Sequence, residues 1–373
     1  MLSSTTWRAL ILSLALALSG GVLVACGDDD DNGGGGGSGG GDGGGGSIAF
    51  LLPESKTARY ESQDRPNFVR RVKELCDDCE IIYSNADQDA SKQQQQAEAA
   101  ITRGAEVLVL DPVDAASAGP VVARAKQSDI PVVSYDRLIT DADIDYYISF
   151  DNERVGELQG ESLVDELEGQ DKGDGTIVMI NGAPTDNNAR QFKAGAHSVL
   201  DDAVEIGAEY DTPDWSPDRA QTQMDQAITR LGRDGFQGVY AANDGTAGGA
   251  IAAMKAAGID PTTVPTTGQD AELAAIQRIL AGEQFMTVYK AIKPEAEQAA
   301  ELAVALARGE EVPANLEISQ VDNGQKQVDS IILEPIAVTK DNVADTVVAD
   351  GFWSVEDICT AAYADFCAEV GLE

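Results

Sequence analysis

The chain has 373 residues, and its 64 acidic side chains outnumber 26 basic ones, which gives a formal net charge of −38 at pH 7. This charge excludes nucleic acid as a partner, because binding to a phosphate backbone depends on clustered Lys and Arg. The single histidine, His197, follows a helical pattern without a nucleophile motif, which argues against Ser-His-Asp or Cys-His catalysis. The acidic residues are typical of a solvated surface, and adaptation to a salty exterior is a second interpretation.

The N-terminus carries the pattern of an export signal. Arg8 precedes an apolar run over 9–18, and small residues lead to Cys26, which acidic residues and a glycine tract follow. This order resembles a bacterial lipoprotein signal, which implies cleavage before Cys26 and lipidation of its thiol. A transmembrane anchor is the alternative, but the apolar run is shorter than the about 20 residues that span a bilayer. We therefore expect a signal peptide over 1–25, a lipidated, glycine-rich tether over 26–47, and a protein anchored to the outer face of the cell membrane.

Residues 48–373 are numerous enough for two compact lobes. In the first half, short apolar runs alternate with amphipathic stretches, which predicts strands separated by single helices and hence a parallel sheet. The predicted elements are strand 48–52, helix 64–76, strand 80–84, helix 90–103, strand 107–111, helix 115–127, and strands 131–135 and 146–150.

The same alternation begins again after Asn152, so the sequence predicts two similar α/β halves with Rossmann-like parallel sheets. The predicted elements are helix 153–168, strand 175–180, helix 188–200, strand 205–210, helix 218–230, strand 238–241, helix 246–257, strand 264–267, helix 271–281, strand 285–289, helix 294–308 and a last group of strands around 331–338.

Polar side chains of both charges follow the predicted strands directly. Asp or Asn at such a position often caps the next helix. Caps do not explain Arg137 and Lys290, because a positive charge gains nothing at a helix start. Side chains of both signs suit a neutral polyol, whose hydroxyl groups both donate and accept hydrogen bonds, and aromatic residues can cover its C–H faces. The residues concerned are Arg59, Tyr60, Asp136, Arg137, Asp186, Asn188, Trp215, Asn243, Asp270 and Lys290.

Several stretches resemble, in order, the ribose/galactose-type periplasmic binding protein family of bacterial ABC import systems. They cover 133–139, 141–145, 147–153, 155–159, 186–189, 243–251, 268–271 and 286–290. The resemblance implies a type I periplasmic binding protein fold, in which two lobes joined by three hinge strands close on one sugar.

Position by position, the resemblance also implies the ligand contacts. It assigns them to Arg59, Asp136, Arg137, Asp186, Asn188, Asn243, Asp270 and Lys290, with the sugar ring between Tyr60 and Trp215. Tyr60 stands where relatives often have a tryptophan, which bears on which sugar fits. D-xylose is the expected sugar, and another aldose is the alternative.

The hinges define the expected lobes. Crossings near Asp151, near Tyr289 and within 321–330 would divide the chain. The first lobe would then comprise 48–151 plus 290–322, the second 152–289 plus 323–356, and a cysteine-containing tail 357–373. The closed protein would deliver its sugar to a membrane permease and its ATPase. We expect a monomer without cofactor or metal, and no membrane contact beyond the lipid.

Three other functions compete with transport. A sugar sensor that feeds a receptor would use the same fold. A glycosidase would use two carboxylates of the cleft, but neighbouring Arg and Lys hold these ionised rather than raising the pKa of a proton donor. A repressor of this fold would need a basic helix-turn-helix before Ile48, where the signal stands instead. Because the cleft does not suit a glycosidase, we expect no enzyme activity.

Four cysteines beyond Cys26 lie in a compartment that allows disulfides. Two local pairs are the simplest of the three possible connectivities. A zinc site is the alternative, but the two pairs are far apart in sequence and no histidine accompanies them. The local pairs would be Cys76 with Cys79 and Cys359 with Cys367.

Overall fold

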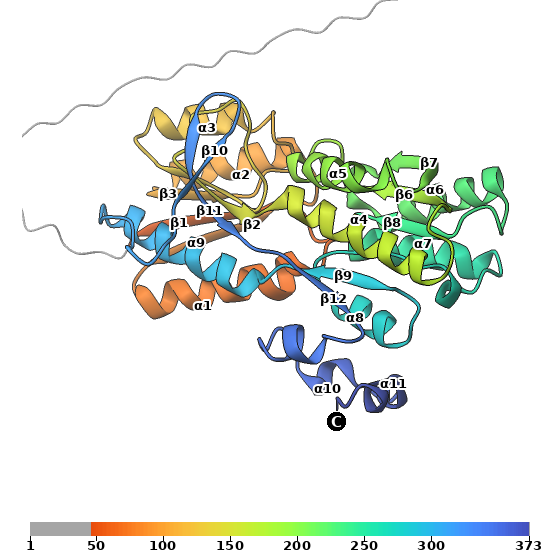
Figure 1. Ribbon diagram of the computed structural model, residues 1–373. Coiled ribbons are helices and arrows are strands. Elements are labelled where there is room, and N and C mark those ends of the chain that lie inside the picture. The colour runs from red at the N-terminus through yellow and green to blue at the C-terminus, as the bar shows by residue number, and fades with distance from the viewer. Residues whose placement is uncertain (1–45, 373) are drawn as a thin grey trace, which may run out of the picture. The chain divides into compact units, whose positions relative to one another are not determined.

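The computed structural model describes residues 46–372 (Figure 1). The predicted signal peptide, Cys26 and all but the last two residues of the predicted tether lie outside the described residues. Within 46–372, the helices are too short or too polar for any of them to span a bilayer.

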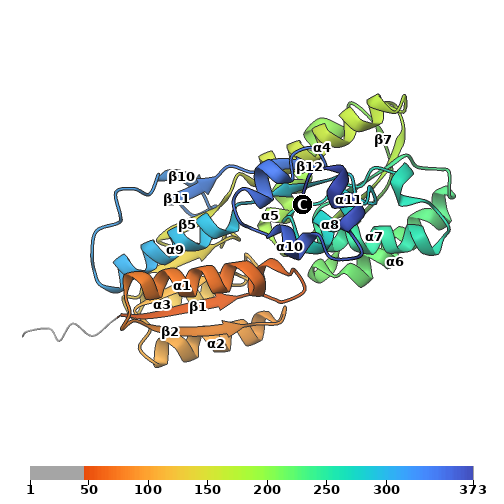
Figure 2. The ribbon, with the colours of Figure 1, turned by 90° about the horizontal axis from the view of Figure 1, so that it is seen from below.

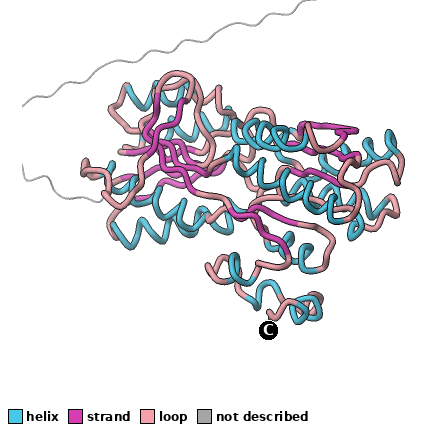
Figure 3. Tube along the Cα trace, in the orientation of Figure 1, coloured by secondary structure: helices cyan, strands magenta, loops and turns pink. Residues whose placement is uncertain are grey.

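The first lobe is built on a seven-stranded sheet in the order β10-β11-β5-β4-β3-β1-β2. All neighbours pair in parallel except β10 and β11. Residues of β1 are buried on both faces, because helices cover both sides of the sheet, as is usual for parallel sheets (Figure 3). The strands are β1 Ser47–Leu52, β2 Glu80–Asn85, β3 Val107–Leu110, β4 Val132–Tyr135, β5 Tyr146–Phe150, β10 Ser319–Asp322 and β11 Gln327–Leu333.

Four helices cover this sheet. Helices α1 (Arg65–Leu75) and α9 (Ile292–Ala307) share one core with the side chains of Ile48 and Phe50. On the opposite face, α2 (Ala90–Thr102) and α3 (Gly119–Lys126) pack against the alternate residues of β1. A short π-helix, η1 (Tyr60–Asp64), leads into α1 and begins directly after Arg59. It places Arg59 and Tyr60 beyond the carboxyl end of β1.

The second lobe repeats this design. Its strands run in the orders β7-β6-β8 and β12-β9, and two parallel bridges, Val239 with Thr266 and Gln269 with Val288, connect the two sets. Helices α4 and α5 cover one face, α6 and α7 the other. The elements are α4 Asn152–Gly169, β6 Thr176–Asn181, α5 Asn187–Leu200, β7 Glu205–Asp211, η2 Pro213–Trp215, α6 Pro217–Leu231, β8 Gly238–Ala241, α7 Asp244–Ala256, η3 Pro261–Thr263, α8 Leu273–Leu280, β9 Met286–Tyr289 and β12 Ile336–Thr339.

Two glycines allow α4 and α5 to pack closely. A Cβ on Gly156 would lie 2.0 Å from the carbonyl oxygen of Phe192, and one on Gly195 would lie 2.0 Å from that of Glu153. Only glycine fits at either position. This close approach fixes the position of α5 relative to α4, and the N-terminal end of α5 lies at the site described below.

The chain crosses between the lobes three times. The first two crossings follow β5, at Asp151, and β9, at Lys290, near the predicted hinges. The predicted position of the third crossing was wrong. Strand β11 pairs in parallel with β5 up to Leu333, so residues 323–333 follow the first lobe, and the chain crosses at 334–335 rather than within 321–330. The residues before and after Pro335 are both apolar, so the sequence predicts one group of strands where the structure has two strands in different lobes.

The C-terminal residues pack on the second lobe. After β12 come η4 (Ala344–Val348), α10 (Val355–Ile358) and α11 (Ala364–Glu369), which share a core with α8 and β9. Residues 357–372 are thus part of a packed unit rather than a separate tail. The structure bonds Cys359 to Cys367 here and Cys76 to Cys79 at the end of α1, with Cα–Cα distances of 5.9 and 5.3 Å.

Candidate functional site

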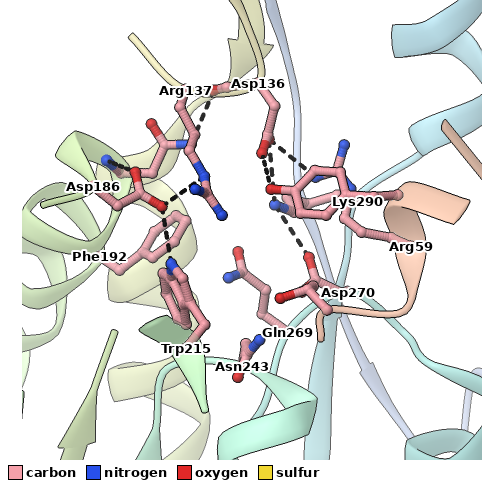
Figure 4. Close-up of a pocket in the computed structure, with 13 residues that line it drawn as sticks. Arg59, Asp136, Arg137, Asp186, Phe192, Trp215, Asn243, Gln269, Asp270 and Lys290 are labelled. Atoms are coloured by element: carbon pink, nitrogen blue, oxygen red, sulfur yellow. Dashed lines mark hydrogen bonds and ion pairs between the residues drawn. The ribbon is translucent and has the colours of Figure 1, made fainter. Parts of the chain in front are cut away.

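A cavity lies where the carboxyl ends of the strands of both lobes meet (Figure 4). Polar side chains of both charges line it together with aromatic rings, so it suits a small polar molecule. The structure brings all ten predicted ligand residues to its wall. The wall consists of Thr57, Arg59, Tyr60, Asp136, Arg137, Asp186, Asn188, Phe192, Trp215, Asn243, Gln269, Asp270 and Lys290.

Arg59 is surrounded by carboxylates of the first lobe. Its Nη2 lies 2.6 Å from Asp64 Oδ1 and 2.6 Å from Glu295 Oε2, and its Nη1 lies 3.0 Å from Asp136 Oδ1. The hydroxyl of Tyr60 donates to the other oxygen of Asp136 at 2.9 Å. All five side chains are buried. This network therefore fixes Asp136 in the wall of the cavity.

Lys290 lies between an aspartate of each lobe. Its Nζ is 3.1 Å from Asp270 Oδ1 and 3.8 Å from Asp136 Oδ1. Burial opposes ionisation of Asp136, but the Arg59 guanidinium, aided by Lys290, holds the pKa of this carboxyl well below its usual range. Asp136 is therefore a permanent hydrogen-bond acceptor and a poor proton donor.

Both aspartates adopt left-handed backbone conformations. The φ angle is 54° at Asp136 and 95° at Asp270. Each backbone N–H donates to a neighbouring strand, to Ile148 O at 2.8 Å and to Val288 O at 2.9 Å. Such conformations cost about 1–3 kcal/mol each and persist where surrounding bonds over-determine them, which is common at functional sites.

Arg137 joins the lobes. Its Nε lies 3.0 Å from Asp186 Oδ2 in the second lobe, and the first-lobe carboxylates of Asp111 and Glu54 are farther away, at 3.6 and 3.7 Å. Burial raises the pKa of the Asp111 carboxyl well above its usual value and also raises that of Glu54, although Arg137 opposes both shifts. Burial raises the pKa of Asp186 as well, so it is by distance that Asp186 is the nearest ion-pair partner of Arg137.

Asp186 serves as both a helix cap and a site residue. Its Oδ1 accepts the backbone N–H of Asn188 and caps α5, while its Oδ2 accepts the indole N–H of Trp215 at 3.0 Å. Asn243 likewise caps α7 while it lines the cavity. Capping and site formation, weighed as alternatives from the sequence, therefore coexist.

Two buried amide oxygens of the wall lack a donor among the described residues, and Asp270 Oδ1 has only its ion pair with Lys290. The two amide oxygens are Asn188 Oδ1 and Gln269 Oε1. The amide nitrogens of the same side chains donate to Asp136 O at 2.9 Å and to Ala242 O at 3.2 Å. An unmade hydrogen bond of this kind costs about 1–3 kcal/mol, so a ligand that donates here would be stabilised.

Aromatic side chains bound the second-lobe side of the cavity. Trp215 and Phe192 pack edge to face with centroids 6.3 Å apart. Gly182 lies beneath the indole, where a Cβ would come within 2.1 Å of Trp215 Cη2, so a larger residue would displace the ring. On the first-lobe side, Tyr60 lies within 5.6 Å of the guanidinium groups of Arg59 and Arg137.

Sequence reasoning missed three residues of the wall. Phe192 lies one helical turn after Asn188 in α5, and this spacing is the signal that could have identified it. Gln269 directly precedes the predicted site residue Asp270, and this position is the signal that could have identified it. Thr57 belongs to the loop before Arg59 and carried no signal of its own. Within 46–372, no cluster of three or more His, Cys, Asp or Glu side chains is arranged to hold a metal ion.

The fold and the cavity can now be compared with known proteins. The family described as periplasmic binding protein domain matches residues 48–311. The chain belongs to this family. A D-xylose-binding periplasmic protein of Escherichia coli is 42% identical over 310 residues, which cover 82% of this chain and 90% of that protein. Another, from Haemophilus influenzae, is 40% identical over 301 residues, which cover 79% and 87%.

Solved structures agree with this assignment. A solute-binding protein of an ABC transporter from Clostridium phytofermentans, solved with β-D-glucose, matches with a TM-score of 0.76 and 30% identity over 84% of this chain and 99% of that one. The predicted type I fold is confirmed. As a periplasmic binding protein, the chain is a solute receptor and not an enzyme, which sets the glycosidase alternative aside.

Proposed function

We propose that this protein is the sugar-binding component of an ABC importer and holds one neutral monosaccharide, D-xylose, between its lobes. The observation that carries the proposal is the pair of buried acceptors without donors, Asn188 Oδ1 and Gln269 Oε1, in a small cavity. Sugar hydroxyl groups supply the missing donors. The ten residues of the predicted site would make the ligand contacts, with the ring between Tyr60 and Trp215.

The charges of the wall favour a neutral ligand. Arg59, Arg137 and Lys290 each have a carboxylate within 3.1 Å, so none of these cations is left to bind an anionic group. A sugar acid or sugar phosphate would instead meet Asp136, Asp186 and Asp270. Repulsion by these carboxylates would disfavour it.

D-xylose is favoured among neutral sugars for two reasons. The relatives described above with the highest identity are D-xylose-binding proteins. In addition, D-glucose carries one hydroxymethyl group more than D-xylose, and the wall beside Trp215 and Phe192 would have to accommodate it. We therefore expect pentoses to bind more tightly than the corresponding hexoses.

Binding would proceed by closure of the lobes around the three crossings. Direct bonds join the lobes on either side of the cavity: Asn188 Nδ2 donates to Asp136 O at 2.9 Å, and Ala115 N donates to Thr185 O at 3.1 Å. A sugar that contacts both walls would favour this closed arrangement over an open one by its differential affinity. The closed form would then deliver the sugar to the permease and its ATPase.

Calorimetric titration of the protein without its lipid anchor tests the ligand. We expect one site per chain and the tightest binding for D-xylose in a series with D-ribose, L-arabinose, D-glucose and xylitol. D-xylonate, which replaces the aldehyde carbon by a carboxylate, is the matched anionic control. Tighter binding of D-xylonate than of D-xylose, or binding of none of these compounds, would contradict the proposal.

The anchor has a separate test. Cells that express the full chain should retain it in the membrane fraction, and Cys26→Ser should release it, because only the cysteine thiol takes the lipid. Equal fractionation of both proteins would remove the lipid anchor from the proposal and leave sugar binding untouched.

A further inference from the structure

The C-terminal segment, residues 340–372, belongs to neither sheet and lies beside α8 in both ribbon views (Figures 1 and 2). The disulfide between Cys359 and Cys367 closes it internally. Gln277 of α8 donates to Ile358 O at 3.1 Å, and Lys340 pairs with Glu369 at 2.9 Å. The segment is therefore held firmly against the second lobe, outside the cavity.

Trp353 contacts the backbone next to a cavity residue. Its indole N–H donates to the carbonyl oxygen of Ala271 at 2.8 Å. Asp270 and Ala271 are successive non-glycine residues with φ angles of 95° and 49°. A pair of such conformations depends on bonds from its surroundings. The indole supplies one of these bonds, and the hydroxyl of Thr287, which accepts the N–H of Ala271 at 3.2 Å, supplies another.

Phe352 contacts the residue that precedes another cavity residue. Its ring packs edge to face on Tyr289, with centroids 5.1 Å apart, and both side chains are buried. Tyr289 ends β9, and Lys290 follows it directly. The contact with Phe352 therefore fixes the position of Tyr289 and, through it, the backbone that leads into Lys290.

The same residue also reaches the first lobe. Gln63 Nε2 donates to Phe352 O at 3.2 Å. Gln63 lies in η1, which carries Tyr60 and follows Arg59. Three chain segments that each carry a cavity residue thus converge on the dipeptide Phe352–Trp353, which itself does not line the cavity.

We propose that Phe352 and Trp353 are positioning residues for the sugar site: Trp353 holds Asp270 in its left-handed conformation, and Phe352 joins the second lobe to η1 when the lobes are closed. Sugar affinity would then depend on a C-terminal segment that touches no sugar. This inference rests on the proposed function.

Trp353→Phe tests the inference, because it removes the indole N–H and retains an aromatic ring. We expect D-xylose to bind about threefold to tenfold more weakly, as for the loss of one hydrogen bond. Gln277→Leu is the matched control, because it loosens the same segment away from Ala271. It should lower the melting temperature of the sugar-free protein and leave the affinity unchanged. An unchanged affinity in Trp353→Phe, or an equal loss in Gln277→Leu, would overturn the inference.

A double-mutant cycle with Asp270→Asn distinguishes positioning from general packing. If Trp353 acts through Asp270, Trp353→Phe should change the affinity less than about twofold in the Asp270→Asn background. The same fold-loss in both backgrounds would contradict this.

Gln63→Leu tests the contact between the lobes and keeps the inference testable if Trp353→Phe does not fold. Its side chain is only partly buried. We expect faster sugar dissociation at an unchanged association rate, because the lost bond exists only in the closed form. Unchanged dissociation in Gln63→Leu would overturn the role of Phe352. Failure of the unaltered protein to bind any sugar would instead overturn the proposed function, and this inference with it.

Discussion

Arg59 and Arg137 are two buried guanidinium groups of the same cavity, and they are held in different ways. The carboxylates around Arg59 all belong to the first lobe and lie within 3.0 Å. Arg137 has its nearest carboxylate, Asp186, in the second lobe, and the carboxylates of its own lobe are at least 3.6 Å away. The wall around Arg59 is thus complete within one lobe, whereas Arg137 completes its pairing only where the lobes meet.

The first and largest expected effect concerns Arg59. Arg59→Met would leave buried carboxylates without a counter-charge, and breaking such a pair costs about 3–5 kcal/mol. We expect this loss in the free energy of unfolding of the sugar-free protein, measured by denaturant titration. Arg154→Met is the matched control, since Arg154 pairs with Glu157 and Glu161 on the surface, where ion pairs contribute about 0–1 kcal/mol. Similar losses of stability in the two variants would contradict the expected difference between the buried ion pairs of Arg59 and the surface ion pairs of Arg154.

The second prediction concerns Arg137. Arg137→Met should destabilise the sugar-free protein less than Arg59→Met does, because the carboxylates of its own lobe lie at least 3.6 Å away and its nearest partner belongs to the other lobe. It should weaken D-xylose binding by about 2–5 kcal/mol, because Asp186 would be left buried and unpaired in the closed form. Calorimetry and denaturant titration on the same samples measure both quantities. A loss of stability without a loss of affinity would reverse the roles of the two arginines.

The third prediction sharpens the comparison with a pair of acids. Burial raises the pKa of Glu272 to about 8, aided by Asp244 and Asp270, and its Oε1 accepts the N–H of Ala58 across the lobes at 3.4 Å. Burial also raises the pKa of Asp244, to about 7, but its partners Gln284 and Thr287 belong to its own lobe. Of these two acids, only Glu272 contacts the other lobe, so only its pKa should change when the lobes close.

The sign of the pH effect follows from that change. Asp244 and Asp270 belong to the same lobe as Glu272 and raise its pKa in either form, while the N–H of Ala58 opposes the shift. The added burial on closure raises the pKa of Glu272 further, so closure takes up part of a proton. D-xylose affinity should therefore decrease as the pH rises toward about 8 and level off above that value, where Glu272 is ionised in both forms. Glu272→Gln should remove the dependence in titrations between pH 5 and 9. A pH-independent affinity of the unaltered protein would exclude Glu272 as a contact made on closure.

The smallest expected effect concerns the charge of the whole surface. A net charge of −38 destabilises the compact state by self-repulsion, which salt screens. The melting temperature should rise with salt concentration in the unaltered protein and in Arg137→Met alike, because the cavity charges are buried. A flat response would favour a merely solvated surface over adaptation to a salty exterior.

Sequence pattern predicted the site well because the fold places the carboxyl ends of strands together. Asp136 and Lys290 directly follow strands and Asn243 comes two residues after one, so their convergence needs no long-range information. The counter-charges could not be predicted in this way. Glu295 faces Arg59 from α9, 236 residues along the chain, and nothing local to either residue indicates the contact.

The C-terminal part was predicted least well. Strands β11 and β12 contain similar apolar runs, and only pairing with β5 or β9 decides the lobe to which each belongs. Likewise, Trp353 had no role in the sequence analysis, because its partner is a backbone carbonyl whose position depends on the left-handed conformation of Ala271. Local propensity carries no information about such contacts.

A crystal structure of the protein grown with D-xylose is the most direct test of the central claim. We expect one pentose in the cavity between Trp215 and Tyr60, with its hydroxyl groups donating to Asn188 Oδ1 and Gln269 Oε1 and with Arg137 still paired to Asp186. A pentose bound elsewhere, or a cavity filled by protein side chains in the presence of the sugar, would contradict the account.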